Sequence, residues 1–513
     1  MKNRQKVINS LLILGLILTV LLIYSSNLDG PFILDDFRIQ TNPQIQIDNL
    51  TLQNLVKAGF ESSPGTRPIA HISFALNYFF HGFDTRGYHL VNIAIHALTA
   101  IFLYLFIQTT LNLPLLKPKY DGFYLLPFAA ALLWAVHPLQ TQSVTYIIQR
   151  MNSMAGMFYI LSFYFYIKGR ITEKTWQNGV LFLSSLTSGL LALGSKEIAA
   201  TLPFFIFLYE WYFLQDLDSN WLKKQIVPVF ILLLTVALLV MLYLGENPIG
   251  YILNSYSKRE FTLTQRLLTE SRVIIFYVSL LLFPHPGRLN LDHDFVLSTG
   301  IGTPFTTLLS ALFLLIILIV SVGSAKKHRL FSFCILWFLG NLVIESSVIG
   351  LEIIFEHRNY LPSMMLVLLG LVLIYSILKH PYPKLIALCL IVLLCSYWTF
   401  ERNKMWNDKV VFWGDCVGKS PQKARPHNNL GVALAAQDRT DEAIKHYKKT
   451  IEIDPQFGKA FNNLGNAYQK SGKYEEARAL YEKALEIIPD NPKIHVNMGI
   501  ALAKLGQLEE ALI

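Results

Sequence analysis

Long apolar runs separated by short basic loops are the feature that most constrains what this chain can fold into. A helix needs roughly 20 apolar residues to cross about 30 Å of hydrocarbon, and about eleven runs in residues 1–400 approach that length. Hydrophobic residues make up 53% of the 513 and charged residues only 15%, unlike a soluble protein. We expect an all-α, polytopic membrane helix bundle with spans at 7–24, 90–108, 123–136, 153–167, 179–194, 198–214, 226–244, 303–322, 330–344, 360–378 and 385–400.

Two shorter apolar stretches decide the predicted topology. Residues 69–80 are interrupted by His71, Ser73 and Asn77, and residues 273–283 end at Pro284. Both are too short to span, so we expect them to be interfacial helices. The basic loops then share the cytoplasmic side with the N-terminus, whose apolar run acts as a signal anchor rather than a cleaved signal peptide. An odd number of crossings places residues 401–513 on the extracytoplasmic side.

The net charge, the cysteines and the missing nucleotide motif argue against several function classes. The net charge of +9 does not indicate nucleic-acid binding, because the basic residues lie in short loops between apolar runs. The four cysteines form no CxxC pair and no metal-ligand spacing. A glycine-rich phosphate loop is absent, which argues against a nucleotide-driven pump.

The last 90 residues carry an internal repeat of 34 residues. A small residue follows each repeat's glycine by twelve positions, at Ala443, Ala477 and Ala511. This spacing predicts tetratricopeptide repeats, in which paired helices stack into an α-solenoid. We therefore divide the chain into a membrane domain (1–400), a connecting helix or linker (401–423) and repeats at 424–457, 458–491 and 492–513. The third is incomplete, so we expect the natural array to continue. The repeated motifs are Asn429-Leu430-Gly431, Asn463-Leu464-Gly465 and Asn497-Met498-Gly499.

With this topology, the outer ends of the helices collect most of the unusual polar residues. Ionisable groups there are costly unless they face a cavity or each other. Singly they have plain explanations, such as Lys196 pairing with Glu197. Together they predict a polar cavity in which Arg or Lys holds an anionic phosphate and a carboxylate accepts a proton from a hydroxyl. The candidates are Arg67, His137, Arg150, Lys196, Glu197, Arg288, Asp292, His293, Glu356, His357 and Arg358.

An adjacent acidic pair, Asp35 and Asp36, follows the first apolar run on the same side of the membrane. Two charges in a solvated loop would explain it. The alternative is a catalytic base and its partner held at the membrane surface for chemistry on a lipid-linked substrate. Our hypothesis makes Asp36 the base and Asp35 the residue that orients the acceptor.

The triplet Asp292-His293-Asp294 resembles a set of metal ligands, but we favour its membership of the polar cavity over a metal site. The three ligands are adjacent, and no second histidine cluster completes a coordination shell. We therefore expect no firm cofactor, with Asp292 and Asp294 as the candidate ligands if a divalent metal binds.

The order of motifs resembles the transmembrane and tetratricopeptide-repeat-containing protein O-mannosyltransferases and their bacterial relatives, within the glycosyltransferase C superfamily. Gln142 and Asn152 depart from the acids expected in the animal members, so their sugar and acceptor need not transfer. The motifs are LDDF (34–37), GYHLVNIAIHALTA (87–100), HPLQTQSVTYIIQRMNSMAG (137–156), GSKEIAATLP (194–203), RLLTES (266–271), RLNLDHDF (288–295) and HRNYLPS (357–363).

The resemblance implies an inverting glycosyltransferase. It would move a mannose-like hexose from a polyprenyl-phosphate donor to a protein or other envelope acceptor on the extracytoplasmic side. It matches Asp35 and Asp36 to the family's acidic pair, and Arg150, Lys196 and Arg358 to basic residues near the donor phosphate. Short loops point to a bacterial inner-membrane protein with periplasmic repeats that present the acceptor.

Two hypotheses from other classes stay open. One is a non-catalytic, membrane-anchored scaffold whose repeats recruit envelope proteins. The other is a transporter or flippase.

Overall fold

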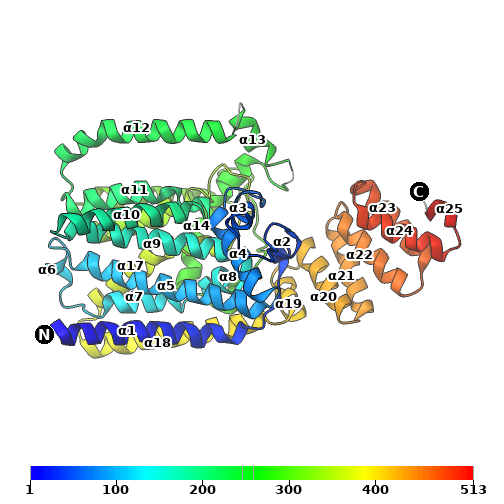
Figure 1. Ribbon diagram of the computed structural model, residues 1–513, viewed down its shortest axis with the longest axis horizontal. Coiled ribbons are helices and arrows are strands. Elements are labelled where there is room, and N and C mark those ends of the chain that lie inside the picture. The colour runs from blue at the N-terminus through cyan, green and yellow to red at the C-terminus, as the bar shows by residue number, and fades with distance from the viewer. Residues whose placement is uncertain (1, 245–246, 258, 512–513) are drawn as a thin grey trace. The chain divides into compact units, whose positions relative to one another are not determined.

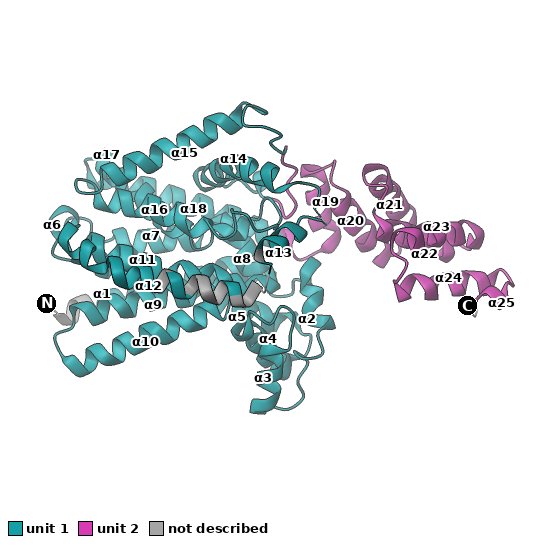
Figure 2. Cartoon of the chain, turned by 90° about the horizontal axis from the view of Figure 1, so that it is seen from above, with its two compact units in different colours: residues 1–289, 297–404 teal, residues 290–296, 405–513 magenta. Residues whose placement is uncertain are grey.

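The structure, a computed structural model, describes residues 2–244, 247–257 and 259–511. In these ranges the regular secondary structure is helical, apart from an isolated bridge between Gly300 and Thr303. The chain forms two compact units (Figure 2), one of residues 1–289 with 297–404 and one of residues 290–296 with 405–513. The all-α fold with a repeat solenoid is confirmed. The sequence put the boundary at 400/401 and did not anticipate that 290–296 joins the second unit.

The first unit is a bundle of long helices (Figure 1), and every apolar run that lies in the described residues falls on a helix. The helix bounds differ from the predicted runs by a few residues, since hydropathy does not mark caps and turns. Its helices are α1 (Lys2–Tyr24), α2 (Phe37–Thr41), α3 (Leu52–Phe60), α4 (Pro68–His81), α5 (Thr85–Leu111), α6 (Lys117–Tyr120), α7 (Leu126–Ala135), α8 (Thr141–Thr145), α9 (Arg150–Ile171), α10 (Thr175–Leu193), α11 (Leu202–Tyr209), α12 (Ser219–Leu244), α13 (Pro248–Asn254), α14 (Leu263–Leu282), α15 (Thr306–Gly323), α16 (Arg329–Leu342), α17 (Ser363–Ile377) and α18 (Pro381–Met405).

Helical stretches long and apolar enough to cross a membrane confirm that this is a membrane protein. By length and composition, five such stretches occur in the described part of the chain, and α7, α16 and α17 are shorter apolar helices. The number of crossings predicted from the sequence, about eleven, stays a prediction. The five stretches are Lys6–Asn27, Thr85–Leu111, Glu197–Leu214, Thr306–Gly323 and Pro381–Met405.

Helices α1 and α18 run in the same direction and finish at the same end of the bundle. The side-chain amide of Asn403 donates to the backbone carbonyl of Ile23 at 3.2 Å, and Thr145 donates to the Asn403 side chain at 2.6 Å. Two parallel helices at the start and end of a bundle require an odd number of crossings between them, counting both. We call this the site end of the bundle.

Helix α14 lies across the site end. It begins at Leu263, ten residues before the apolar stretch predicted at 273–283, because a capping box at Thr262 and Gln265 starts the helix earlier. Near its N-terminus Arg266 donates to the Ser347 carbonyl at 3.0 Å, and near its C-terminus the Leu281 carbonyl accepts from His137 Nε2 at 3.1 Å. Both ends of α14 thus contact loops at the site end, and its interfacial position stays a prediction.

The opposite end of the bundle, which we call the basic end, carries the Lys- and Arg-rich loops. Arg170 pairs with Glu210 at 2.6 Å, and Arg329 donates to the Tyr212 carbonyl at 3.0 Å. Lys384 lies over the Phe123 ring at 5.2 Å. Between the two ends, an aromatic core packs around the buried Trp337.

The second unit contains helix pairs of the predicted repeats. Gly431 and Gly465 let the rings of Tyr447 and Tyr481 pack directly on the preceding helix of each pair. Ahead of the repeats, Trp406 and Trp413 are buried against Phe412, so these tryptophans pack within this unit. Its helices are α19 (Lys409–Lys419), α20 (Ala424–Ala436), α21 (Thr440–Ile453), α22 (Gly458–Lys470), α23 (Tyr474–Ile487), α24 (Pro492–Lys504) and α25 (Leu508–Ala511).

Candidate functional site

The acidic pair lies on a short 3-10 turn, Leu34–Asp36, just after α1. Asp36 is buried, and its carboxylate accepts two backbone N–H bonds, from Ile33 at 2.9 Å and from Ile148 at 2.7 Å. The second bond joins segments 112 residues apart. Asp36 therefore fixes the first loop onto the segment that leads into α9.

Asp35 is placed differently from its neighbour. Its backbone N–H donates to the Tyr146 hydroxyl at 2.9 Å, which holds the residue at the same loop. Its side chain remains 39% exposed, and the nearest cation is Arg38 at 3.5 Å. Of the two carboxylates, Asp35 presents the one that an incoming hydroxyl can reach.

A buried ion pair lies beside the first turn of α9. Lys196 follows α10, and its ammonium lies 2.7 Å from Glu345 Oε1 and 3.0 Å from Asn152 Oδ1. Ile148, which binds Asp36, lies on the 3-10 turn Ile147–Gln149 just before α9, and Asn152 is four residues further along the chain. Burial lowers the pKa of Lys196, although Glu345 opposes this shift. Burial would raise the pKa of Glu345, but Lys196 and Arg358 outweigh it and hold that pKa low.

Arg358 and Arg266 extend this polar region on its α14 side. Arg266 is fully buried and lies 2.9 Å from Glu270 Oε1, and Arg358 lies 4.0 Å from the same oxygen. Arg358 also donates to the carbonyls of Glu352 and Ile353, and its Nε makes no hydrogen bond to the described residues. Burial raises the pKa of Glu270 despite both guanidinium groups. Glu356, another buried acid, lies on the same 3-10 turn as Arg358, so buried charges of both signs gather in this region.

Arg67 and Glu197 form a more open pair at the start of α4. Arg67 Nε donates to Glu197 Oε2 at 3.0 Å, and Thr66 donates to Glu197 Oε1 at 2.6 Å. The Arg67 side chain keeps 27% of its surface exposed. Arg67, rather than Lys196, is thus the ion-pair partner of Glu197.

Arg150 lies in the core rather than beside a ligand space. It is fully buried and donates to Asn92, Asn77, Ser73 and Tyr88 at 2.6–3.2 Å. Its guanidinium also lies 4.6 Å from the centre of the Phe74 ring. With these bonds made, Arg150 braces α4 and α5 against α9, and its placement does not favour the phosphate-binding role expected from the sequence.

The histidines of the candidate set have structural partners. His137 Nε2 donates to the Leu281 carbonyl, while its Nδ1 accepts from the Leu139 backbone at 3.3 Å. His357 Nδ1 and the His357 backbone N–H both donate to Gln142 Oε1 at 2.8 Å. The amide at 142, one of the two departures from the family pattern, therefore positions the His357 turn. Glu356 lies buried on that same 3-10 turn.

The structure does not bring the remaining candidates into this cluster. Arg288 folds back onto its own segment, donating to the Ser279 carbonyl at 3.0 Å and to its hydroxyl at 2.7 Å. Asp292, His293 and Asp294 belong to the second unit, where Asp292 lies 3.5 Å from Arg425. Among the described residues, no group of three or more His, Cys, Asp or Glu side chains is arranged as metal ligands.

Sequence reasoning missed four residues of the cluster: Glu345, Glu270, Arg266 and Tyr146. Glu345 gave the clearest available signal, a single acid directly after an apolar run. The sequence does not reveal its pairing, because its partner Lys196 is 149 residues away. No spacing rule relates two such positions.

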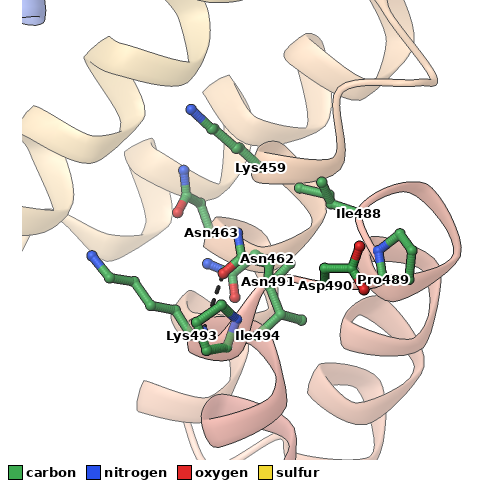
Figure 3. Close-up of a pocket in the computed structure, with 10 residues that line it drawn as sticks. Lys459, Asn462, Asn463, Ile488, Pro489, Asp490, Asn491, Lys493 and Ile494 are labelled. Carbon is green, nitrogen blue, oxygen red and sulfur yellow. Dashed lines mark hydrogen bonds between the residues drawn. The ribbon is translucent and has the colours of Figure 1, made fainter. Parts of the chain in front are cut away.

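The repeat unit has its own hollow, of about 630 Å³ (Figure 3). Lys459 and Lys493 occupy equivalent positions 34 residues apart, and neither forms an ion pair with a described residue. Asn side chains link successive repeats, with Asn463 donating to Asn428 at 2.9 Å and Asn497 donating to Asn462 at 3.0 Å. The hollow therefore combines amides and two unpaired cations with one carboxylate, Asp490.

The family model described as "TPR repeat" matches residues 433–472 and 466–506, which confirms the repeats. The chain is 26% identical to "Protein O-mannosyl-transferase F38B6.6" of Caenorhabditis elegans, over 88% of this chain and 64% of that protein. It is 26% identical to "Protein O-mannosyl-transferase TMTC1" of Homo sapiens, over 84% and 54%. It is 25% identical to "Protein O-mannosyl-transferase TMTC4" of Mus musculus, over 83% and 64%.

The chain thus spans 54–64% of the length of these curated relatives. A crystal structure of MamA protein matches 24% of this chain and 66% of its own, at 25% identity, but its TM-score of 0.20 supports no structural conclusion. The matches cover both the membrane bundle and the repeats, as the motif order predicted. Over most of its length, the chain is similar in sequence to the transmembrane and tetratricopeptide-repeat-containing protein O-mannosyltransferases.

Proposed function

We propose that this chain is a membrane glycosyltransferase that moves a mannose-like hexose from a polyprenyl-phosphate donor to a protein acceptor, with inversion at the anomeric carbon. One observation carries the proposal. The backbone of Asp35, whose carboxylate is partly exposed, is fixed to Tyr146, and Asp36 is fixed to Ile148, four residues before Asn152, which accepts a hydrogen bond from the buried Lys196. A base and a phosphate-binding group are the two elements that such a transfer needs.

We assign Asp35 as the base and Asp36 as its positioning residue, the reverse of the roles expected from the sequence. Both oxygens of Asp36 accept backbone N–H bonds, so this carboxylate is committed to holding the loop. Asp35 has the accessible carboxylate. In the proposed reaction Asp35 takes the proton of the acceptor hydroxyl, the hydroxyl oxygen bonds to the anomeric carbon, and the sugar–phosphate bond breaks on the opposite face. Asp36 positions the base.

Lys196 is our choice for the leaving phosphate, assisted by Arg358 and Arg67. An ammonium held at a fixed position stabilises the negative charge that develops on the departing phosphate oxygen. The Glu345 carboxylate at 2.7 Å favours the ammonium form of Lys196 and so opposes the effect of burial on its pKa. Arg358 carries a buried Nε that makes no hydrogen bond to the described residues. In contrast, all three guanidinium nitrogens of Arg150 already donate hydrogen bonds within the protein.

The acceptor side rests on the repeats. Tetratricopeptide arrays bind proteins on extended surfaces, and the hollow around Lys459 and Lys493 offers amide and ammonium donors to an extended peptide. The chain leaves α18 at the site end, where Asp35 also lies. We place that end in the periplasm of a bacterial inner membrane, because the Lys- and Arg-rich loops gather at the other end.

The decisive experiment compares wild type with Asp35→Asn in membranes supplied with polyprenyl-phosphate mannose and an envelope-protein extract. Transfer should fall by about 10²–10⁴-fold in the variant, while insertion and acceptor binding stay unchanged. If wild-type membranes transfer no sugar from any polyprenyl-phosphate donor yet still bind the acceptor, the scaffold hypothesis replaces this one. Full activity in Asp35→Asn would remove Asp35 from the mechanism.

A further inference from the structure

A crevice at the basic end of the bundle has no part in the proposed transfer. It has a volume of about 460 Å³ and lies between α15, α16 and α17 beside the α6 segment. Its rim carries Lys119, Ser324 and His328, and its walls carry Val320, Leu369 and Leu373. All of these residues belong to the first unit.

The crevice changes from polar to apolar with depth. Helix α15 runs towards the basic end, so Val320 lies roughly 6 Å deeper than Ser324, at 1.5 Å per residue. On α17, Leu369 lies roughly 10 Å deeper than Ser376 by the same rise. A ligand that fills the crevice must therefore join an apolar tail to a polar head.

The side of the crevice formed by α15 faces lipid. Only 11% of the most apolar window of α15 is buried within the protein. Large side chains along this helix, among them Leu315, Ile316 and Ile319, are more than half exposed. A bilayer lipid can thus enter sideways, without crossing a polar barrier.

The charge at the rim selects the head group. Lys119 lines the crevice, and Lys384, which is not itself part of the lining, lies 5.2 Å from the centre of the Phe123 ring, which is. Neither lysine forms an ion pair with a described residue, and no acidic side chain is among the described residues that line the crevice. Basic pockets between transmembrane helices bind the phosphates of anionic lipids.

We propose that this crevice binds one anionic phospholipid, with its phosphate at Lys119 and Lys384 and an acyl chain along Val320 and Leu369. The assignment does not depend on the glycosyl-transfer proposal, because it uses residues of the opposite end. The occupant is a lipid rather than free phosphate, since the walls below the rim are hydrocarbon.

The test is lipid binding to the full chain, purified in detergent, followed by native mass spectrometry. Wild type should retain one dioleoyl phosphatidylglycerol at least about tenfold more strongly than dioleoyl phosphatidylcholine. Lys119→Gln with Lys384→Gln should abolish that preference, since each lysine near a lipid phosphate contributes roughly a fivefold gain. The matched control, Lys223→Gln with Lys224→Gln, removes the same charge from exposed positions on α12 outside the crevice and should change nothing.

A second variant separates the crevice from diffuse surface attraction. Ser376 is exposed at the mouth, so Ser376→Trp fills the space while keeping every charge. It should reduce phosphatidylglycerol retention as strongly as the double lysine variant. Normal retention in Ser376→Trp, equal retention of both lipids by wild type, or displacement of the lipid by glycerol 3-phosphate alone would each overturn the proposal.

Discussion

The ammonium of Lys196 lies 2.7 Å from a carboxylate oxygen of Glu345, and each side chain keeps only 8% of its surface exposed. The two residues come from the loops after α10 and α16, so one ion pair joins two separate helical hairpins at the site end. Removing one partner leaves an uncompensated charge in a low-dielectric site. Glu345 therefore controls both the position and the charge of Lys196.

Glu345→Gln should cost about 3 kcal/mol of stability, the usual penalty for breaking a buried pair. It should also lower the pKa of Lys196 further, because burial is then opposed less. The thermal unfolding midpoint in detergent measures the first effect. Lys196→Met with Glu345→Met is the matched control: it should recover much of the lost stability, because it removes both charges. Equal midpoints for wild type and Glu345→Gln would contradict the prediction.

Asp36→Asn should destabilise the first loop, whereas Asp35→Asn should not. An amide at 36 can accept only one of the two backbone N–H bonds, which leaves a buried donor unpaired at a cost of about 1–3 kcal/mol. Asp35 has a half-exposed pair with Arg38, worth about 1 kcal/mol or less. Hydrogen exchange of residues 33–36 in the full chain should report faster opening only for Asp36→Asn. The reverse order would mean that Asp36 does not anchor the loop.

Arg150→Ala should fail to fold, rather than fold normally and bind the donor more weakly. It would orphan the side-chain oxygens of Asn92 and Asn77 and the carbonyls of Ser73 and Tyr88, all inside the bundle. The expected loss exceeds about 3 kcal/mol, since hydrogen bonds to a charged group contribute about 1.5–3 kcal/mol each. Monodisperse yield on size-exclusion chromatography measures it. A well-folded Arg150→Ala with a raised KM for donor alone would restore the phosphate-binding role.

The first repeat should lose stability in acid. His427 Nδ1 lies 3.0 Å from His446 Nδ1, and His427 Nε2 donates to the Pro421 carbonyl, so His427 Nδ1 in a neutral ring accepts from His446. Burial lowers the pKa of both, with nearby Lys449, Glu452 and Glu442 contributing less. The unfolded state then binds more protons below pH about 6.5, so stability present above that pH is lost as pH falls.

Hydrogen exchange of α20 and α21 in the full chain, corrected for intrinsic rates, checks this pH dependence. The second repeat provides an internal control, because Phe461 and Leu480 stand at the equivalent positions and cannot titrate. His427→Phe with His446→Leu should remove the extra acid sensitivity of the first repeat. If both repeats open equally at pH 5, the histidine pair is not its cause.

Sequence periodicity predicted the helices and repeats of the fold well. It predicted the site poorly, because contacts between residues far apart in the sequence build the site. Apolar runs located the helices, and the 34-residue spacing located the repeats, because both patterns are local. The sequence could not predict the structural role of Arg150. A basic residue near a helix end has the same sequence pattern whether it binds a ligand or, as here, donates to four buried oxygens. The different environments of Asp35 and Asp36 depend on Ile148, more than a hundred residues away.

The two tyrosine-packed glycines of the repeats offer a local test of the packing. A Cβ at Gly431 would lie 2.5 Å from the Tyr447 ring, and one at Gly465 would lie 2.6 Å from the Tyr481 ring. Gly431→Ala and Gly465→Ala should each cost about 1–3 kcal/mol through overpacking, despite the better helix propensity of alanine. At the equivalent Gly499 the nearest atom would be the Ala511 carbonyl oxygen at 3.3 Å, so Gly499→Ala should cost much less. Limited proteolysis of the full chain measures all three, and equal protection across them would show that the tyrosine rings do not set the helix spacing.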